Sequence, residues 1–149
     1  MSGAAPAEEL VHQLGRTLAK ANACLERLMA QEGVTGLVPS HGDILAALFS
    51  AEPASMQQLA QACSRDPSTV TALVKKLERE GYVSVEQSPA DGRSKQVRLT
   101  QRGRALRPKF ERISVRLREV QSRGVSAADL ETAARVLGTM QGNFKEECR

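Results

Sequence analysis

The feature that most constrains this 149-residue chain is a change of hydrophobic period near Gly81. Before it, apolar residues recur every three or four positions over 55–64 and over 67–80, which predicts two amphipathic helices joined by a short turn. After it, apolar and polar residues alternate, which predicts a β-hairpin over 83–99. Two short helices followed by a hairpin form the layout of a winged helix-turn-helix.

Start and turn signals support this reading. Ser55 is followed three positions later by a glutamine, the pattern of a capping box. Asp66 precedes Pro67, so that an N-cap side chain and a first-turn proline mark the start of the second helix. Gly81 can end that helix in the left-handed conformation. The tip of the hairpin carries Asp91-Gly92, a turn-forming pair.

Longer amphipathic segments flank this lobe. The spacing of apolar residues predicts a helix over 8–30, another that begins at Pro39, and two more over 101–122 and 126–147. Thr100 and Ser126 are the expected N-caps of the last two. Pro108 lies about two turns into the 101–122 segment, where we expect it to bend the helix. The predicted fold class is therefore mainly α with a small β-hairpin.

Positive charge is concentrated in the middle of the chain. Residues 52–107 carry ten basic and six acidic side chains, a net charge of +4, whereas residues 1–51 carry three basic and five acidic ones, a net charge of −2. Such a distribution indicates a module that binds a polyanion, although a run of charge is also consistent with a plain solvated face.

Several classes of protein are disfavoured. No segment reaches the roughly 18 uninterrupted apolar residues of a membrane span, and the N-terminus does not resemble a signal peptide, so we expect a cytoplasmic protein without a membrane partner. Three scattered cysteines do not form a disulfide framework. There is no phosphate-binding glycine loop and no nucleophile elbow, so we expect neither an enzyme nor a bound cofactor.

The exposed face of the 67–80 helix is suited to duplex DNA. Its first turns carry small side chains that permit close approach to base edges, and its later turns carry cations that can meet phosphates. The candidate DNA-binding residues of this helix are Ser68, Thr69, Thr71, Ala72, Lys75, Lys76 and Arg79.

The same region resembles the MarR family of bacterial regulators. The runs that carry the resemblance are DPSTVTALVKKLEREGYV and SPADGRSKQVRLTQRG. They contain the wing motif D-x-R-x-K, formed by Asp91, Arg93 and Lys95, and the L-T-x-x-G motif that begins at Leu99 and ends at Gly103. The chain departs from the family pattern at Pro108 and at His41-Gly42.

The resemblance implies a single MarR-like chain over 1–149. Its winged helix-turn-helix lobe would span 37–100, and the segments 8–30 and 101–147 would be dimerisation helices. In the family, a homodimer places two recognition helices in the major groove of a pseudopalindromic operator and the wing arginine, here Arg93, in the minor groove. Asp91 would brace the wing. The expected function is that of a repressor that an effector releases from DNA.

Family members often bind small aromatic or phenolic ligands between the first, second and fifth helices. The candidate anchors there are His12, Arg16 and His41. Some relatives sense peroxides through a cysteine of the first helix, and Cys24 has basic neighbours that would favour a reactive thiolate. No set of histidine, cysteine and acidic residues has a recognised metal-ligand spacing, so no metal site is expected.

Two other classes remain open. The chain could be an interaction module whose winged helix binds another protein, which the basic wing disfavours and a salt titration of DNA affinity would test. It could also be a ligand or redox sensor for which DNA binding is secondary. Thiol modification with and without DNA would separate that class from the first.

Overall fold

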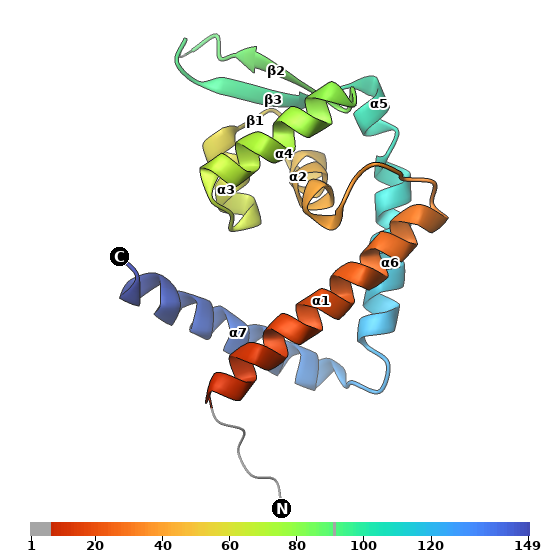
Figure 1. The fold of residues 1–149 in the computed structure, drawn as a ribbon, viewed down its shortest axis with the longest axis vertical. Helices are drawn as coiled ribbons and strands as arrows, with labels where there is room; N and C mark the ends of the chain where they lie inside the picture. Colours follow the sequence, from red (N-terminus) through yellow and green to blue (C-terminus); the bar gives the residue numbers. More distant parts are fainter. Residues whose placement is uncertain (1–6, 91) are drawn as a thin grey trace, which may run out of the picture. The chain divides into compact units, whose positions relative to one another are not determined.

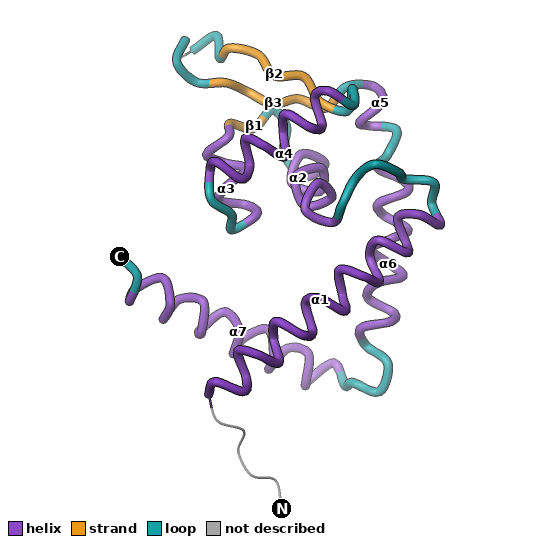
Figure 2. The backbone as a smooth tube through the Cα atoms, viewed as in Figure 1, coloured by secondary structure: helices purple, strands orange, loops and turns teal. Residues whose placement is uncertain are grey.

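A computed structural model describes residues 7–90 and 92–149 of the chain. The chain forms two compact units: the first ends at Ile113 and the second is formed by Ser114–Arg149. Helices account for most of the described backbone, and the strands gather in one small sheet of the first unit (Figure 2). The elements in chain order are α1 (Ala7–Gln31), α2 (Pro39–Ser50), β1 (Ala54–Ser55), α3 (Met56–Cys63), α4 (Pro67–Arg79), β2 (Val83–Gln87), β3 (Lys95–Leu99), α5 (Gln101–Arg104), α6 (Arg107–Gln121) and α7 (Ala127–Glu147).

The helix-turn-helix and the hairpin form where the sequence predicts them (Figure 1). Ser55 caps α3 by accepting a hydrogen bond from the Gln58 N–H at 3.1 Å, while the Gln58 side chain accepts one from the Ser55 N–H at 2.9 Å. After α4, Gly81 has a φ of +80°, the left-handed conformation that ends the helix without strain.

The core of the first unit lies between α2, α3 and α4. Its fully buried side chains are aliphatic, and each contributes about 1.5–3 kcal/mol by leaving water. The largest of them are Ile44, Leu45, Leu48, Leu59, Val70, Val74 and Leu77, together with Val97 of β3. This packing directs the opposite face of α4 to solvent.

The sheet has a third strand that the sequence does not predict. β3 is the middle strand, with β2 on one side and the two-residue β1 on the other. β2 and β3 pair antiparallel from Val83↔Leu99 to Gln87↔Lys95, as expected of a hairpin. β1 adds only Ala54↔Val97 and its neighbour, and thereby attaches the hairpin to the start of α3.

The prediction of one bent helix over 101–122 is wrong. The chain forms a short α5 and then a separate α6, in whose first turn Pro108 lies. Proline lacks an N–H and is accommodated in a first turn, where that N–H would have no intrahelical partner. Leu106, between the two helices, is buried. The proline thus begins a new helix instead of bending an existing one.

Within the first unit, the start of α6 packs against α2 and the end of α1. A Cβ at Gly42 would lie 3.0 Å from Cε1 of Phe110, so the absence of a side chain there lets the aromatic ring approach α2. Arg112 binds Glu32 through two nitrogens, at 2.8 Å from Nη2 and 3.0 Å from Nε. The Arg112 hydrogen bonds hold the pKa of the Glu32 carboxyl below its usual value.

The second unit contains the end of α6 and the whole of α7. The Ser126 hydroxyl caps α7 by accepting from the Asp129 N–H at 3.1 Å, as the sequence predicts. No residue of α7, which the structure describes throughout, is buried, and Val136, Leu137 and Phe144 are exposed apolar side chains on it. Over 7–90 and 92–149, no helix combines the length and the apolar character needed to cross a membrane.

Candidate nucleic-acid interface

The start of α4 is fixed by the turn that precedes it. Ser64 ends α3 in the left-handed conformation, with a φ of 51°, which turns the chain sharply. Arg65 then binds Asp43 of α2 at 2.8 Å, so the turn is tied to the core helix beneath it. Asp66 accepts from the Ser68 N–H at 3.1 Å and also from the Ser68 hydroxyl. These bonds hold the pKa of the Asp66 carboxyl below its usual value, and the cap stays ionised.

The solvent face of α4 brings most of the predicted residues together. Because Val70, Val74 and Leu77 are buried, the opposite face of the helix points away from the core. Five of the seven candidates are exposed, and the other two are half-buried. The exposed five are Ser68, Thr69, Ala72, Lys75 and Arg79, and the half-buried two are Thr71 and Lys76. The small side chains lie in the first turns and the cations in the later ones, as predicted.

Two of these side chains also have partners inside their own helix. The Thr71 hydroxyl donates to the Pro67 carbonyl oxygen at 2.9 Å. The Lys76 ammonium lies 3.4 Å from a carboxylate oxygen of Glu80, one turn further along. Thr71 keeps its methyl group and its oxygen lone pairs for other contacts, and Lys76 can reach a phosphate only by competing with the Glu80 charge.

The wing is formed by β2, β3 and the loop over 88–94. The Ser88 N–H donates to the Ser94 carbonyl oxygen at 2.8 Å, which closes the loop just beyond the last strand pair. Arg93 and Lys95 are exposed on this arm. Asp91, the predicted brace of the wing, lies outside the described residues.

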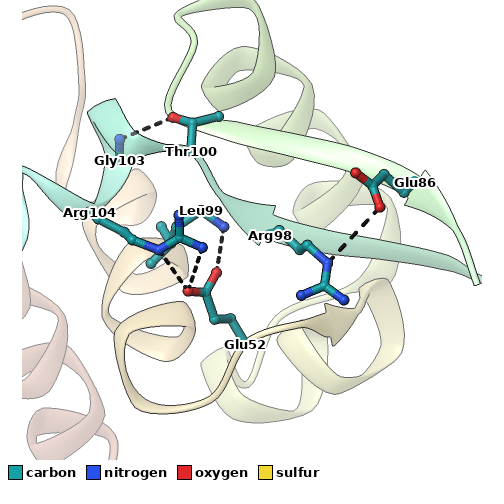
Figure 3. A network of polar contacts seen from close by, with 7 residues as sticks. All are labelled: Glu52, Glu86, Arg98, Leu99, Thr100, Gly103 and Arg104. Atoms are coloured by element: carbon teal, nitrogen blue, oxygen red, sulfur yellow. Dashed lines mark hydrogen bonds and ion pairs between the residues drawn. The ribbon is translucent and has the colours of Figure 1, made fainter.

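At the base of the wing, the contacts of Glu52 are not predicted from the sequence, whereas the cap at Thr100 is (Figure 3). The Glu52 carboxylate accepts from the Leu99 N–H at 2.7 Å and from Nε of Arg104 at 3.1 Å. Thr100 caps α5 by accepting from the Gly103 N–H at 3.1 Å. The motif identifies Thr100 and Gly103, whereas Glu52 lies 47 positions before Leu99 and has no local signal around it.

The candidate effector residues have different surroundings. His12 and Arg16 are exposed on α1, whereas His41 is buried at the start of α2. The Nδ1 of His41 accepts a hydrogen bond from the Val38 N–H at 3.0 Å, so the ring caps its own helix. Burial, with a contribution from the nearby Lys76 charge, lowers the pKa of the His41 imidazole.

The cysteines give no sign of a shared site. Cys24 and Cys63 are half-buried, Cys148 is exposed, and all three are free thiols. Burial and the Asp43 charge raise the pKa of the Cys63 thiol, which makes it a poor nucleophile. Within 7–90 and 92–149, no three histidine, cysteine or acidic side chains are grouped so that they could hold a metal ion.

Comparison with known proteins agrees with this geometry. The family model for the MarR family matches residues 37–95, which include the two helices and most of the wing. The HTH-type transcriptional regulator YdgJ of Bacillus subtilis is 31% identical over 113 residues, which cover 76% of this chain and 69% of that protein. The fold and its exposed basic face therefore define a DNA-binding transcription regulator, not an enzyme. The chain belongs to the MarR family.

Solved structures with the same fold include ligand-responsive regulators. BpsR of Bordetella bronchiseptica, whose DNA binding is regulated by 6-hydroxynicotinic acid, matches with a TM-score of 0.81 and 23% identity, over 93% of this chain and 98% of that one. PcaV of Streptomyces coelicolor, solved in complex with its natural ligand, matches with a TM-score of 0.80 and 19% identity, over 95% and 98%. These two matches show a shared fold.

Proposed function

We propose that this protein is a repressor that binds a pseudopalindromic operator as a homodimer. The α4 helix of each protomer enters the major groove with Thr69 and Thr71 toward the bases and Lys75 and Lys76 toward phosphates. Arg93 enters the neighbouring minor groove, where a narrow groove concentrates negative potential. Bound in this way, the dimer blocks access of RNA polymerase to the promoter.

One observation carries the proposal. The solvent face of α4 and the exposed wing belong to the same lobe, and both are basic, while the buried face of α4 is held by the core. A helix fixed in this way, with small side chains first and cations later, is what major-groove recognition requires. The net charge of +4 over 52–107 provides the attraction to the phosphate backbone.

Selection of bound sequences from random duplex DNA tests the proposal. We expect an enriched site with two similar half-sites about one helical turn apart, and an affinity that falls steeply as salt is raised. A protein-binding module would enrich no sequence and show little salt dependence. In that case the proposal is wrong.

The homodimer accounts for apolar surface that a single chain leaves exposed. Leu10, Val11 and Leu18 of α1 are exposed in the single chain, as are Leu137 and Phe144 of α7. Such stripes on long helices indicate an interface with a second copy. Deletion of residues 126–149 is expected to abolish both dimerisation and tight DNA binding.

A small aromatic or phenolic ligand is proposed as the effector, as BpsR responds to 6-hydroxynicotinic acid. Arg16 and His12 are both exposed on α1. The Arg16 guanidinium can pair with the carboxylate or phenolate of such a ligand, and the His12 imidazole can form a hydrogen bond to it. His41 is the third predicted anchor: its Nδ1 already accepts from the Val38 N–H, which leaves its Nε2–H as the group that would donate to a ligand. If Arg16→Ala and His41→Gln leave release from DNA unchanged for every active ligand, this assignment is wrong.

An oxidant is the second candidate effector, acting through Cys24. This thiol is half-buried on α1, a helix proposed to lie in the dimer interface. Treatment with peroxide should then release the wild-type protein from DNA but not the Cys24→Ser variant. Equal responses of the two proteins would exclude this route.

A further inference from the structure

The middle strand of the sheet has a backbone donor that no strand pairs. β1 is two residues long, and its pairing with β3 ends at Val97. The next amide of β3 on that side is the N–H of Leu99, a residue that is 5% exposed. A buried N–H without a partner is costly, so this position demands an acceptor.

Glu52 provides that acceptor from a side chain. Its Oε2 lies 2.7 Å from the Leu99 nitrogen. Glu52 precedes β1 in the chain, so its own backbone is not part of the sheet at this point. The carboxylate therefore extends the hydrogen-bond ladder by one position beyond the two residues of β1. In Figure 3 the Glu52 side chain reaches from the loop before β1 to the base of the wing.

The second carboxylate oxygen of Glu52 binds α5. Its Oε1 lies 3.1 Å from Nε and 3.0 Å from Nη2 of Arg104. These bonds are charge-assisted and use two donors of one planar guanidinium, which gives them directionality. The Glu52 side chain is only 24% exposed, so solvent screens the pair less than it would an exposed one. One carboxylate thus joins three segments: the loop before β1, the wing strand and α5.

The base of β3 determines where the tip of the wing lies. β3 runs over five residues from Lys95 near the tip to Leu99 at the base. Its four steps of about 3.3 Å span about 13 Å, so a tilt of about 10° at the base moves the far end by about 2 Å. That distance is enough to remove an arginine such as Arg93 from hydrogen-bond range of a groove.

We propose that Glu52, held by Arg104, is a positioning residue that sets the angle at which the wing meets DNA. Glu52 itself touches no DNA and acts through Arg93. The inference rests on the proposed entry of Arg93 into the minor groove. It adds that the affinity contributed by this arginine depends on a carboxylate at the opposite end of the strand.

A double-mutant cycle on DNA affinity tests the proposal. Arg93→Ala alone is expected to weaken operator binding about tenfold or more, and Glu52→Ala alone about tenfold. In the Glu52→Ala background, Arg93→Ala is expected to cost no more than about twofold, because the arginine is already displaced. Independent, multiplicative effects of the two substitutions would overturn the positioning role.

Glu86→Ala is the matched control. Glu86 is also on the wing, and its carboxylate lies 4.0 Å from Nε of a cation, Arg98. This pair joins two side chains, whereas the Glu52 carboxylate also binds a backbone N–H. Its removal changes the net charge by the same amount as Glu52→Ala. We expect near wild-type affinity and an effect independent of Arg93→Ala. A loss equal to that of Glu52→Ala would show that charge alone is responsible and would overturn the proposal.

Glu52→Gln separates positioning from folding. The amide oxygen can still accept from the Leu99 N–H, whereas the charge that holds Arg104 is lost. We expect this variant to lose about threefold in operator affinity and to keep part of the affinity that Arg93 contributes. Hydrogen exchange at the Leu99 amide should be slower than in Glu52→Ala. Should Glu52→Ala fail to fold, the cycle is run with Glu52→Gln, and independence from Arg93 again overturns the inference. If Arg93→Ala alone has no effect, the proposed wing contact itself fails, and the inference fails with it.

Discussion

Gly103 lies directly against the carbonyl group of Tyr82, where a Cβ at Gly103 would be 2.1 Å from the oxygen. Thr100 fixes the same approach from the other side: its N–H donates to the Tyr82 oxygen at 3.0 Å and its hydroxyl donates to the Gly81 oxygen at 2.6 Å. The L-T-x-x-G motif therefore joins the end of the wing to α5 by backbone contact. This contact is the physical reason for glycine at its last position.

Replacement of Gly103 by alanine should destabilise the protein strongly. The added methyl group meets a backbone carbonyl that cannot rotate away, so we expect the free energy of unfolding to fall by about 2 kcal/mol or more. Urea denaturation followed by circular dichroism measures this loss. Gly142→Ala is the control, because a Cβ there meets nothing within 4 Å, the position lies on the face of α7 opposite Leu137 and Phe144, and a helical alanine is favoured by about 1 kcal/mol. Similar effects of the two substitutions would contradict the account.

The buried ring of His41 should make stability depend on pH. Its folded pKa is lowered by burial and by the Lys76 charge, so as pH falls below about 6.5 the unfolded chain binds the proton first. The stability that the neutral ring contributes is fully present above that pH and is lost as pH falls toward the folded pKa.

His41→Gln should remove this dependence while keeping an acceptor for the Val38 N–H. Urea denaturation at a series of pH values measures the free energy of unfolding of both proteins. Between pH 7 and pH 5 it should fall more steeply for the wild-type protein than for the variant. The exposed His12 is present in both proteins and cancels in the comparison. Parallel curves would show that His41 titrates alike in the folded and unfolded chains.

The exposed apolar stripe of α7 should be required for assembly. Phe144 is 57% exposed in the single chain, and Leu137 lies two turns before it on the same face. A double substitution, Leu137→Lys with Phe144→Ser, is expected to convert a dimer into a monomer at micromolar concentration, as sedimentation velocity would report. Thr139→Lys, on the opposite face of the helix, should leave the dimer intact. A wild-type monomer would exclude the proposed assembly.

Local signals predict the helices, and long-range contacts account for what they miss. Ser55, Asp66 and Ser126 all cap helices where the sequence places them, because each cap depends on residues two or three positions away. β1 has two residues and no alternation to detect, and it exists only because the chain before α3 lies beside β3. The sequence could not show this pairing, since its partners are more than 40 positions apart.

The candidate nucleic-acid interface also has a part that local sequence patterns predict and a part that depends on contacts they do not reveal. The exposed face of α4 follows from helical periodicity, and its predicted cations lie on it. The capping role of His41 depends on the geometry of the preceding turn, and the role of Glu52 depends on contacts with Leu99 and Arg104, about 50 positions away. Sequence periodicity carries no information on such contacts.

The most direct test compares Arg93→Ala with Lys75→Ala on a selected operator and on an unrelated duplex over a range of salt. Arg93→Ala should weaken operator binding by about 1–3 kcal/mol and relax the preference at flanking A·T-rich positions. Lys75→Ala should weaken both duplexes about equally and lower the salt slope by about one unit. If Arg93→Ala retains full operator affinity, the wing has no part in recognition and the central claim is wrong.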